Sequence, residues 1–269
     1  MIENDENMFL SFIVPTYNRK NLLQETLDSI LDADFSIGYE VIIVDDCSSD
    51  DTEEFVKSKY AQNLASGIFQ YHFLEKNIGV TGAKNYGASI AKGNWLVFLD
   101  SDDLFIKESK DEFLRELHDN ENCGVVFFRC NTFDGNLLGK EFEENVYYDL
   151  DKYMTLGFPG ECLPVIRKEV ALKFPYEQKL RGFEHIAYFR ILKNNITILV
   201  SRVVARKYRT DNEDRLSNFK GKMKRAKQFY DGYKTSLKEY KDINYPVPNG
   251  LRIRVIAYFF LRFSAIFVR

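Results

Sequence analysis

The stretch "NWLVFLDSDDLF", residues 94–105, decides the fold because it joins a buried strand to a cluster of acidic side chains. Residues 95–99 are apolar and carry no charge, which is typical of a strand covered on both faces of its sheet. Three carboxylates follow within four positions, at Asp100, Asp102 and Asp103. Because like charges this close repel one another, we expect a positive group to lie beside them.

Three further apolar runs precede this strand, at residues 10–14, 41–44 and 69–74. The segments between the runs have apolar residues at helical spacing, around residues 23–31, 52–56 and 83–91. Strands without polar alternation, separated by helices, predict an α/β fold with the order β-α-β-α-β-α-β over residues 8–100. Ligands of such parallel sheets bind beyond the carboxyl ends of the strands.

The predicted strand ends are polar, which suggests a site along one edge of the sheet. The first strand ends at Pro15 and Tyr17, and the second ends at Asp45 and Asp46. Residues i and i+2 of an extended backbone point the same way, so Asp100 and Asp102 can hold one Mg²⁺ or Mn²⁺ ion together with a diphosphate. Asp102 or Asp103 capping a helix that starts near residue 106 is an equally good interpretation of this motif alone.

Several other kinds of site are excluded by pattern. No G-x-G-x-x-G follows the first strand, and no P-loop or EF-hand motif occurs. The four cysteines form no C-x-x-C pair and no zinc-like spacing with the three histidines, which fits packing residues in a reducing compartment. The acidic N-terminal residues contain no basic region and no apolar signal core, so we expect a cytoplasmic protein.

Four stretches together resemble family 2 glycosyltransferases of the GT-A fold, which build bacterial capsule and O-antigen polysaccharides. They are "SFIVPTYNR", "YEVIIVDDCSSDDT", "NIGVTGAKNYGASIAKGNWLVFLDSDD" and "RGFEHIAYFRIL". The resemblance covers about residues 8–217 and implies a GT-A domain at residues 1–217. It further implies a hexosyltransferase that inverts the configuration at the anomeric carbon of the sugar. Such an enzyme depends on Mn²⁺ or Mg²⁺ and uses a nucleoside diphosphate sugar as donor, with UDP favoured. The acceptor would be a hydroxyl of a saccharide or of a lipid-linked saccharide.

The resemblance also assigns roles to single residues. Donor contacts fall on Pro15, Tyr17, Asp45, Asp46, Lys84, Asp100 and Ser101, and metal ligands fall on Asp100, Asp102 and Asp211, where the family often has a histidine. The general base falls on Glu184, six residues before Arg190, although Phe183 stands where the family usually has Glu. Glu184 as a solvated helix residue is the simpler alternative. That altered motif keeps a non-catalytic nucleotide-sugar or polysaccharide-binding protein open as a second function, while the missing Gly-rich loop disfavours a nucleotidyltransferase.

The C-terminal region differs in charge from the rest. Residues 201–269 contain 17 Lys or Arg and 6 Asp or Glu, although the whole chain has a net charge of −3. We expect residues 218–269 to form a basic extension, whose last part, 251–269, is an amphipathic helix with Arg254, Arg262 and Arg269 on one side. This pattern predicts peripheral contact with the inner face of the cell membrane. A helix packed on protein is the alternative, and the lack of aromatics interleaved with Lys and Arg disfavours nucleic acid.

Overall fold

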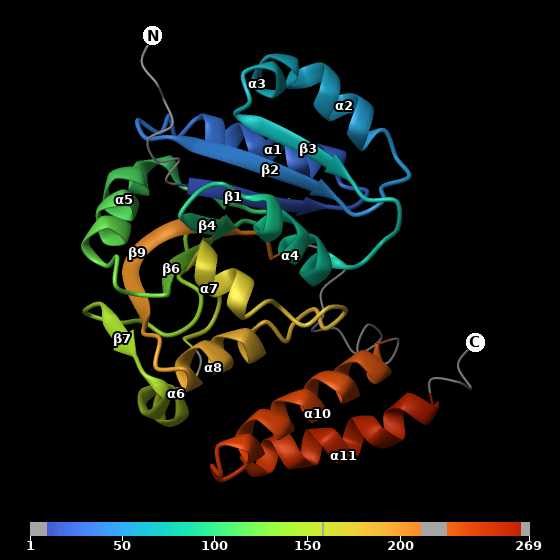
Figure 1. The fold of residues 1–269 in the computed structure, drawn as a ribbon, viewed down its shortest axis with the longest axis vertical. Helices are drawn as coiled ribbons and strands as arrows, with labels where there is room; N and C mark the ends of the chain where they lie inside the picture. The colour runs from blue at the N-terminus through green and yellow to red at the C-terminus, as the bar shows by residue number, and fades with distance from the viewer. Residues whose placement is uncertain (1–9, 158, 211–224, 265–269) are drawn as a thin grey trace.

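The computed structural model describes residues 10–157, 159–210 and 225–264 (Figure 1). In chain order the elements are β1 (Leu10–Thr16), α1 (Lys20–Leu31), β2 (Tyr39–Asp45), α2 (Thr52–Lys59), α3 (Ala61–Ala65), β3 (Phe69–Phe73), α4 (Val80–Ile90), β4 (Trp95–Phe98), β5 (Leu104–Phe105), a 3₁₀ turn (Lys107–Ser109), α5 (Lys110–Asp119), β6 (Val125–Thr132), β7 (Val146–Tyr148), α6 (Leu150–Leu156), β8 (Cys162–Arg167), α7 (Lys168–Lys173), α8 (His185–Lys193), β9 (Ile198–Tyr208), α10 (Ala226–Asp242) and α11 (Asn249–Ser264).

One mixed sheet runs through the molecule in the order β3-β2-β1-β4-β8-β6-β9-β5, with β7 paired to β9. The first four strands in this order are parallel, as predicted from the uninterrupted apolar runs. Strand β8 pairs antiparallel to both β4 and β6 and so separates the parallel half from the rest. The α/β prediction is therefore confirmed, and the carboxyl ends of β1, β2 and β4 meet at one edge.

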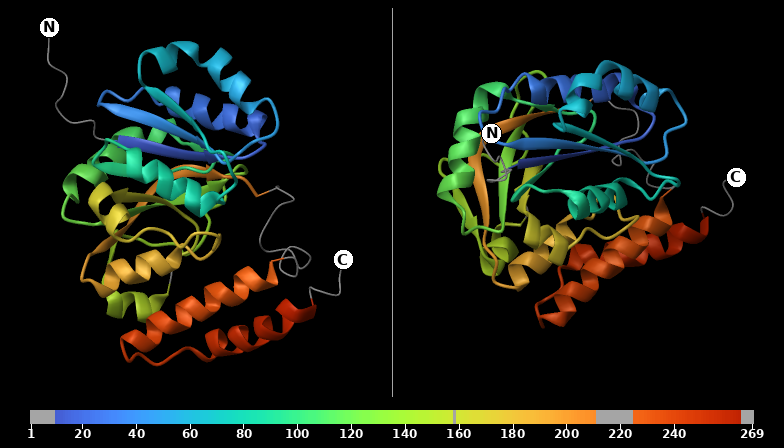
Figure 2. Two further views of the ribbon diagram at one scale, coloured as in Figure 1. Left: turned by 45° about the vertical axis from the view of Figure 1, so that its right-hand side comes forward. Right: turned by 45° about the horizontal axis from the view of Figure 1, so that its top comes forward.

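Helices cover both faces of the sheet because the strands alternate their apolar side chains between two cores. On β1, Phe12 and Val14 belong to the cluster under α1 and α5, whereas Ile13 belongs to the cluster under α4 and α8. Figures 1 and 2 show α1 and α2 on one side of the β1–β3 strands and α4 on the other. A Cβ on Gly87 would lie 2.6 Å from Cγ2 of Ile13, so α4 packs at close range on β1.

Helices α10 and α11 form a hairpin that packs against α8 (Figure 2). The contact is a small apolar cluster of Phe183, Ile186 and Phe229, extended by partly buried Leu180, Tyr233 and Tyr258. Gly232 permits this approach, since a Cβ there would lie 2.5 Å from the Phe183 ring. The hairpin is thereby held beside the start of α8, where the predicted base Glu184 lies.

Candidate functional site

Each of the three carboxylates after β4 pairs with a cation of its own. These cations are the positive groups that the repulsion among the carboxylates led us to expect. The pairs are Asp100 with Lys84 at 2.7 Å, Asp102 with Arg19 at 2.7 Å, and Asp103 with Arg206 at 3.2 Å. The cations come from α4, from the turn after β1, and from β9. Three segments that are far apart in the sequence therefore meet at the end of β4.

The two carboxylates of the D-x-D pair differ in their ionisation. Burial acts to raise the pKa of Asp100, but the charge of Lys84 and its hydrogen bond outweigh that effect and hold the pKa below its ordinary value. The pKa of Asp102 is raised, first by burial and then by the neighbouring charge of Asp100, with Arg19 opposing. Asp102 is thus the carboxylate that gains most from an added positive charge.

The third carboxylate, Asp103, is buried and bound to the backbone just beyond the C-terminal end of β9. It is 1% exposed, and its Oδ1 accepts a hydrogen bond from the backbone N–H of Arg209 at 2.9 Å. Burial raises the pKa of Asp103 to about 7. The helical turn begins only at Lys107, with Ile106 preceding it and no side-chain cap. The interpretation of Asp102 or Asp103 as a helix cap is therefore wrong, because both carboxylates are bound to residues of other elements.

The aspartates at the end of β2 hold neighbouring loops. Asp45 accepts hydrogen bonds from the Tyr71 hydroxyl and from the backbone N–H of Ser48. The carboxylate oxygens of Asp46 accept from the backbone N–H groups of Ile78 at 2.7 Å and Gly79 at 2.8 Å. Gly79 precedes the first residue of α4, so Asp46 fixes the start of the helix that carries Lys84.

The remaining predicted donor contacts lie along the same edge. Pro15 is buried in β1, whereas Tyr17 is 47% exposed just beyond its end. Ser101 is buried between the two aspartates of the D-x-D pair. Asp211 lies outside the described residues.

Glu184 faces the same charged group from the other side. It occupies the N-cap position of α8, and burial raises its pKa, with the charge of Lys84 opposing. Burial also acts against the positive charge of Lys84, but the carboxylates of Asp100 and Glu184 outweigh it and raise the Lys84 pKa. Glu184 is thus half-buried and coupled to Lys84, rather than a fully solvated helix residue.

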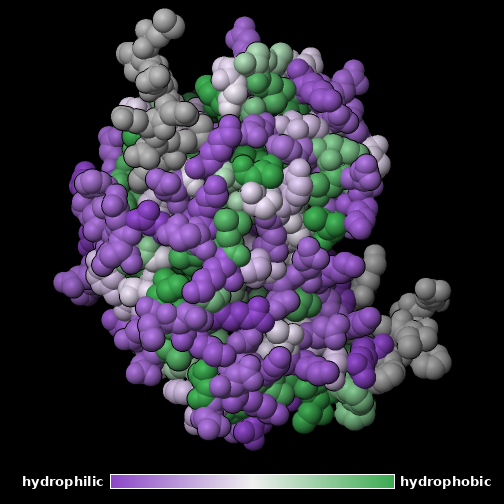
Figure 3. All heavy atoms as spheres, in the orientation of Figure 1, coloured by the Kyte–Doolittle hydropathy of each residue, from purple (hydrophilic) through white to green (hydrophobic). Residues whose placement is uncertain are grey.

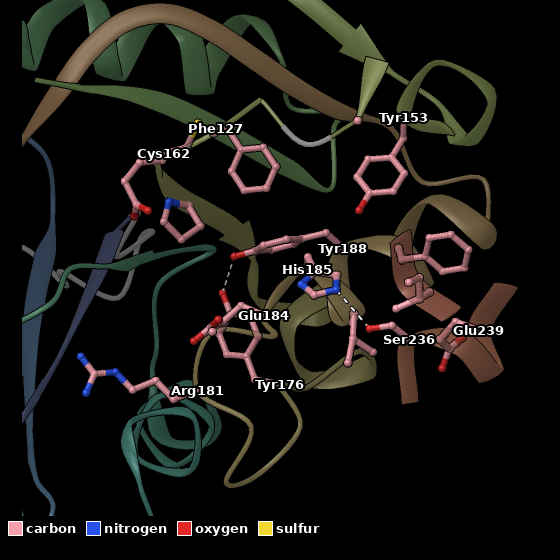
Figure 4. Close-up of a pocket in the computed structure, with 18 of the residues that line it drawn as sticks. Phe127, Tyr153, Cys162, Tyr176, Arg181, Glu184, His185, Tyr188, Ser236 and Glu239 are labelled. Atoms are coloured by element: carbon pink, nitrogen blue, oxygen red, sulfur yellow. Dashed lines mark hydrogen bonds between the residues drawn. The ribbon is translucent and has the colours of Figure 1, made fainter. Parts of the chain in front are cut away.

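A pocket of about 1070 Å³ brings these groups together with the C-terminal hairpin. Lys84, Asp100 and Glu184 line it, whereas Tyr17, Asp46 and Asp102 do not appear among its described lining residues. Figure 4 shows Arg181 and Glu184 toward one end of the pocket and Ser236 and Glu239 toward the other. The pocket therefore includes the Asp100–Lys84 pair but not Tyr17 and Asp46 beyond β1 and β2.

A divalent cation fits the Asp100–Asp102 pair in ligand type and in charge. The two carboxylates are close enough for the charge of Asp100 to raise the Asp102 pKa, so a second positive charge is favourable there. Mg²⁺ often takes only one or two protein carboxylates and completes its shell with water and phosphate oxygens. Across the described ranges no group of three or more His, Cys, Asp and Glu side chains converges, so a cation here would need such outside ligands.

Three arginines of the site were not predicted from the sequence. Arg19 pairs with Asp102, Arg206 pairs with Asp103 and with Glu161 at 2.7 Å, and Arg181 lines the pocket. The signal for Arg206 was a charged residue inside a strand of β-branched neighbours, since such a residue needs a buried partner. Arg19 and Arg181 stand at the borders of two of the quoted motifs, and nothing in their local pattern distinguishes them from surface arginines.

The chain matches known proteins over most of its length. The model of the family described as "Glycosyl transferase family 2" matches residues 11–171. A Campylobacter jejuni protein named "GalNAc(5)-diNAcBac-PP-undecaprenol beta-1,3-glucosyltransferase" is 30% identical over 232 residues, which is 83% of this chain and 71% of that protein. TarS of Staphylococcus aureus, a "Poly(ribitol-phosphate) beta-N-acetylglucosaminyltransferase", is 40% identical over 116 residues, which is 41% of this chain and 20% of TarS.

Solved structures share the fold. TarS residues 1–349 in complex with UDP superimpose with a TM-score of 0.66 at 20% identity, covering 96% of this chain and 72% of that one. The mannosyltransferase PcManGT of Pyrobaculum calidifontis, solved with GDP-Man and Mn²⁺, gives a TM-score of 0.60 at 18% identity, covering 97% and 72%. The architecture is thus that of GT-A glycosyltransferases.

Removing the guanidinium of Arg206 should destabilise the fold, because Asp103 would be left buried without its cation. We expect Arg206→Met to lower the free energy of unfolding by about 3–5 kcal/mol, measured by denaturant unfolding. Lys57→Met is the matched control, since it removes an exposed pair with Glu53 and should cost at most about 0.5 kcal/mol. Equal losses of unfolding free energy in the two variants would show that the buried pair stabilises the fold no more than the exposed pair does.

Proposed function

Because the chain belongs to glycosyl transferase family 2, we propose that this glycosyltransferase moves a sugar, with inversion, from a nucleoside diphosphate sugar to an acceptor hydroxyl. The observation that carries the proposal is a half-buried glutamate, Glu184, and a strand-end aspartate, Asp100, which line one pocket and are both coupled to Lys84. In a single displacement at the anomeric carbon, the general base and the group that binds the diphosphate act on the same donor sugar. They must therefore line one pocket.

The donor is proposed to bind at the edge formed by β1, β2 and β4. Pro15, Tyr17, Asp45 and Asp46 are the candidates for base and ribose contacts, as the family resemblance implies. Asp45 and Asp46 already accept hydrogen bonds from the protein, so we propose that they act mainly by fixing the shape of this edge. The neighbours solved with UDP and with GDP-Man support a nucleotide donor, and we favour a UDP-sugar.

Asp102 and Asp100 are proposed to hold Mn²⁺ or Mg²⁺ with the donor diphosphate. The ion, when bound, would neutralise charge on the departing nucleotide. For Asp102 to take part, its pair with Arg19 must open, which leaves a guanidinium beside the diphosphate. Lys84 remains buried against Asp100 and keeps that carboxylate ionised at neutral pH.

Glu184 is proposed to take the proton from the acceptor hydroxyl. Burial raises its pKa, which makes the carboxylate a stronger base, while the charge of Lys84 favours the ionised form. Inversion follows if the same hydroxyl oxygen attacks the anomeric carbon opposite the leaving diphosphate. The name of the C. jejuni relative supports a lipid-linked saccharide as acceptor, and we propose that the product is a bacterial surface polysaccharide.

The first test is a donor screen. Wild-type protein with Mn²⁺ should slowly release nucleoside diphosphate from its own donor among UDP, GDP and dTDP sugars, measured by a coupled nucleotide assay. Asp102→Asn should reduce this release to near background, and chelation of the metal should do the same. Asp111→Asn, a change on the first turn of α5, is the control. Release that survives in Asp102→Asn at the wild-type rate would remove the metal from the proposal.

The second test concerns the base. Glu184→Gln should slow sugar transfer by about 10²–10⁴-fold with donor KM unchanged, since an amide cannot accept the proton. In the wild type, transfer should fall on the acidic side at a pH above the ordinary glutamate range, because burial raises the Glu184 pKa. Glu177→Gln, which only loses a pair with Arg190, should transfer at nearly the wild-type rate. Transfer by Glu184→Gln at that same rate would assign the base elsewhere.

We propose in addition that α11 contacts the cytoplasmic face of the membrane. No described helix is long and apolar enough to cross a bilayer. On α11, Ile253 is 65% exposed, Ile256 59% and Phe260 65%, so one face is apolar and uncovered. Figure 3 shows hydrophobic and hydrophilic spheres side by side along the lower edge of the molecule, where the hairpin lies.

Two of the three predicted arginines of α11, Arg254 and Arg262, lie beside aromatic rings of α10. The guanidinium of Arg254 lies 5.7 Å from the ring centre of Tyr233, and that of Arg262 lies 4.3 Å from the ring centre of Tyr230. Both rings belong to α10, so these two guanidinium groups lean toward the partner helix, although Arg254 stays exposed; Arg269 lies outside the described residues. Arg252 and Arg254 leave exposed positive charge on α11, and α10 adds a row of exposed lysines: Lys227, Lys234, Lys238 and Lys241.

Vesicle binding tests this contact. The double variant Ile256→Glu with Phe260→Glu should lose co-sedimentation with vesicles of phosphatidylcholine and phosphatidylglycerol, because two charges replace buried apolar area. Leu172→Glu on α7 is a matched change of an exposed apolar residue and should bind like the wild type. Equal sedimentation of all three proteins would place the α11 face against something other than lipid.

A further inference from the structure

The loop between α7 and α8 brings one arginine, Arg181, to the site. Arg181 lines the same pocket as Lys84, Asp100 and Glu184. Its charge favours the ionised form of Asp100 and also that of Asp102, so it acts on both carboxylates of the D-x-D pair. The guanidinium of Arg181 is therefore part of the electrostatics of the proposed metal and diphosphate site.

Arg181 differs from the other cations of the site because it has no carboxylate partner. Lys84, Arg19 and Arg206 each form an ion pair with one of the three carboxylates after β4. Within the described part of the chain, no carboxylate oxygen lies within 4.0 Å of a side-chain nitrogen of Arg181. Figure 4 shows its guanidinium directed away from His185. The charge of Arg181 is thus open to an anionic ligand.

The backbone at Arg181 is fixed by the C-terminal hairpin. Gln228 of α10 donates a hydrogen bond from its side-chain amide to the carbonyl oxygen of Arg181 at 2.9 Å. On either side of Arg181, Leu180 and Phe183 are joined by a backbone hydrogen bond of 3.0 Å, and both side chains pack in the apolar cluster under the hairpin. The loop therefore presents the guanidinium from a fixed point at the edge of the pocket.

The charges around the proposed reaction balance when Arg181 is counted. The D-x-D pair and Glu184 carry three negative charges when all are ionised, whereas Lys84 and Arg19 carry two positive charges. Arg181 supplies the third positive charge, and it stands three positions before Glu184 in the same loop. A ligand that brings or develops negative charge here would find this cation without a competing ion pair.

The proposed transfer shifts one negative charge across the site. Glu184 loses its charge when it takes the acceptor proton, and the departing nucleoside diphosphate gains one when its bond to the anomeric carbon breaks. The total charge is therefore unchanged, but its place moves from the base to the leaving phosphate. A cation near both groups stabilises the charge before and after this shift. A guanidinium suits the task, since its fork of N–H groups matches phosphate oxygens.

We propose that Arg181 binds the phosphate next to the anomeric carbon and stabilises the departing nucleoside diphosphate. This inference rests on the proposed function and adds a phosphate-binding residue to it. Arg19 meets the diphosphate from the turn after β1 once its pair with Asp102 opens. Arg181 meets it from the opposite direction along the chain, on the loop that carries Glu184.

The test compares UDP with UMP, which lacks the phosphate that Arg181 is proposed to bind. Isothermal titration calorimetry of the full chain with Mn²⁺ should show that the wild type binds UDP more tightly than UMP. Arg181→Gln should reduce this preference by about tenfold or more, because charge-assisted hydrogen bonds are lost. Arg181→Lys keeps the charge without the fork, so its preference should lie between those of the other two proteins.

Lys179→Gln is the matched control. Lys179 is an exposed cation of the same loop, two positions earlier, and does not line the pocket. Its substitution removes the same charge, so it should leave the preference for UDP at the wild-type value. An equally large drop in Lys179→Gln would show that any positive charge on the loop has this effect, and it would overturn the specific contact.

Donor hydrolysis on the same preparations separates this inference from the proposed function. Arg181→Gln should lower kcat for hydrolysis with a smaller change in donor KM, since the charge on the leaving phosphate develops as the bond breaks. A wild type that hydrolyses its donor, together with an unchanged UDP preference and rate in Arg181→Gln, rejects only the role of Arg181. A wild type that neither binds a nucleotide nor hydrolyses any donor rejects the proposed function. If the donor screen selects GDP or dTDP, the diphosphate and monophosphate of that nucleoside replace UDP and UMP.

Discussion

Charge pairing after β4 is the constraint on which the site depends. Three carboxylates stand within four residues, and each is neutralised by a cation from a different element. Without these partners the repulsion among the carboxylates would be left in a buried place, where it is weakly screened. The pairs also tie α4, the turn after β1, and β9 to one strand end. The same interactions that solve an electrostatic problem therefore assemble the edge of the sheet at which the donor is proposed to bind.

A second constraint comes from the sheet itself. Strand β1 sends alternate side chains into two cores, so neither face can be left open. Helix α4 is pressed on one face at Gly87 and anchored at its first turn by Asp46. Its position along β1 is thus fixed at both points, and Lys84 between them is presented to Asp100 and Glu184. The packing of α4 on β1 thus determines the position of the Lys84 charge.

Local patterns predicted the part of the structure that depends on local chemistry. Uninterrupted apolar runs gave the parallel strands, and polar strand ends gave the edge that Asp46 and Asp100 share. The partners of the acidic residues could not be found this way, because Arg19 and Arg206 are 83 and 103 positions away from the aspartates they bind, among 37 Lys and Arg. The amphipathic pattern of α11 was visible, but a pattern alone cannot say which face meets α10. Arg254 and Arg262 turned toward tyrosines because a guanidinium can stack on a ring.

The close contact between Gly232 and the Phe183 ring links the C-terminal hairpin to the start of α8. Phe183, the ring that fills the space of the missing side chain, is the residue directly before Glu184. A shift of the hairpin away from α8 would therefore move the peptide next to Glu184, the proposed proton acceptor. The proposed membrane attachment and the proposed base are thus linked through the packing of one phenylalanine ring.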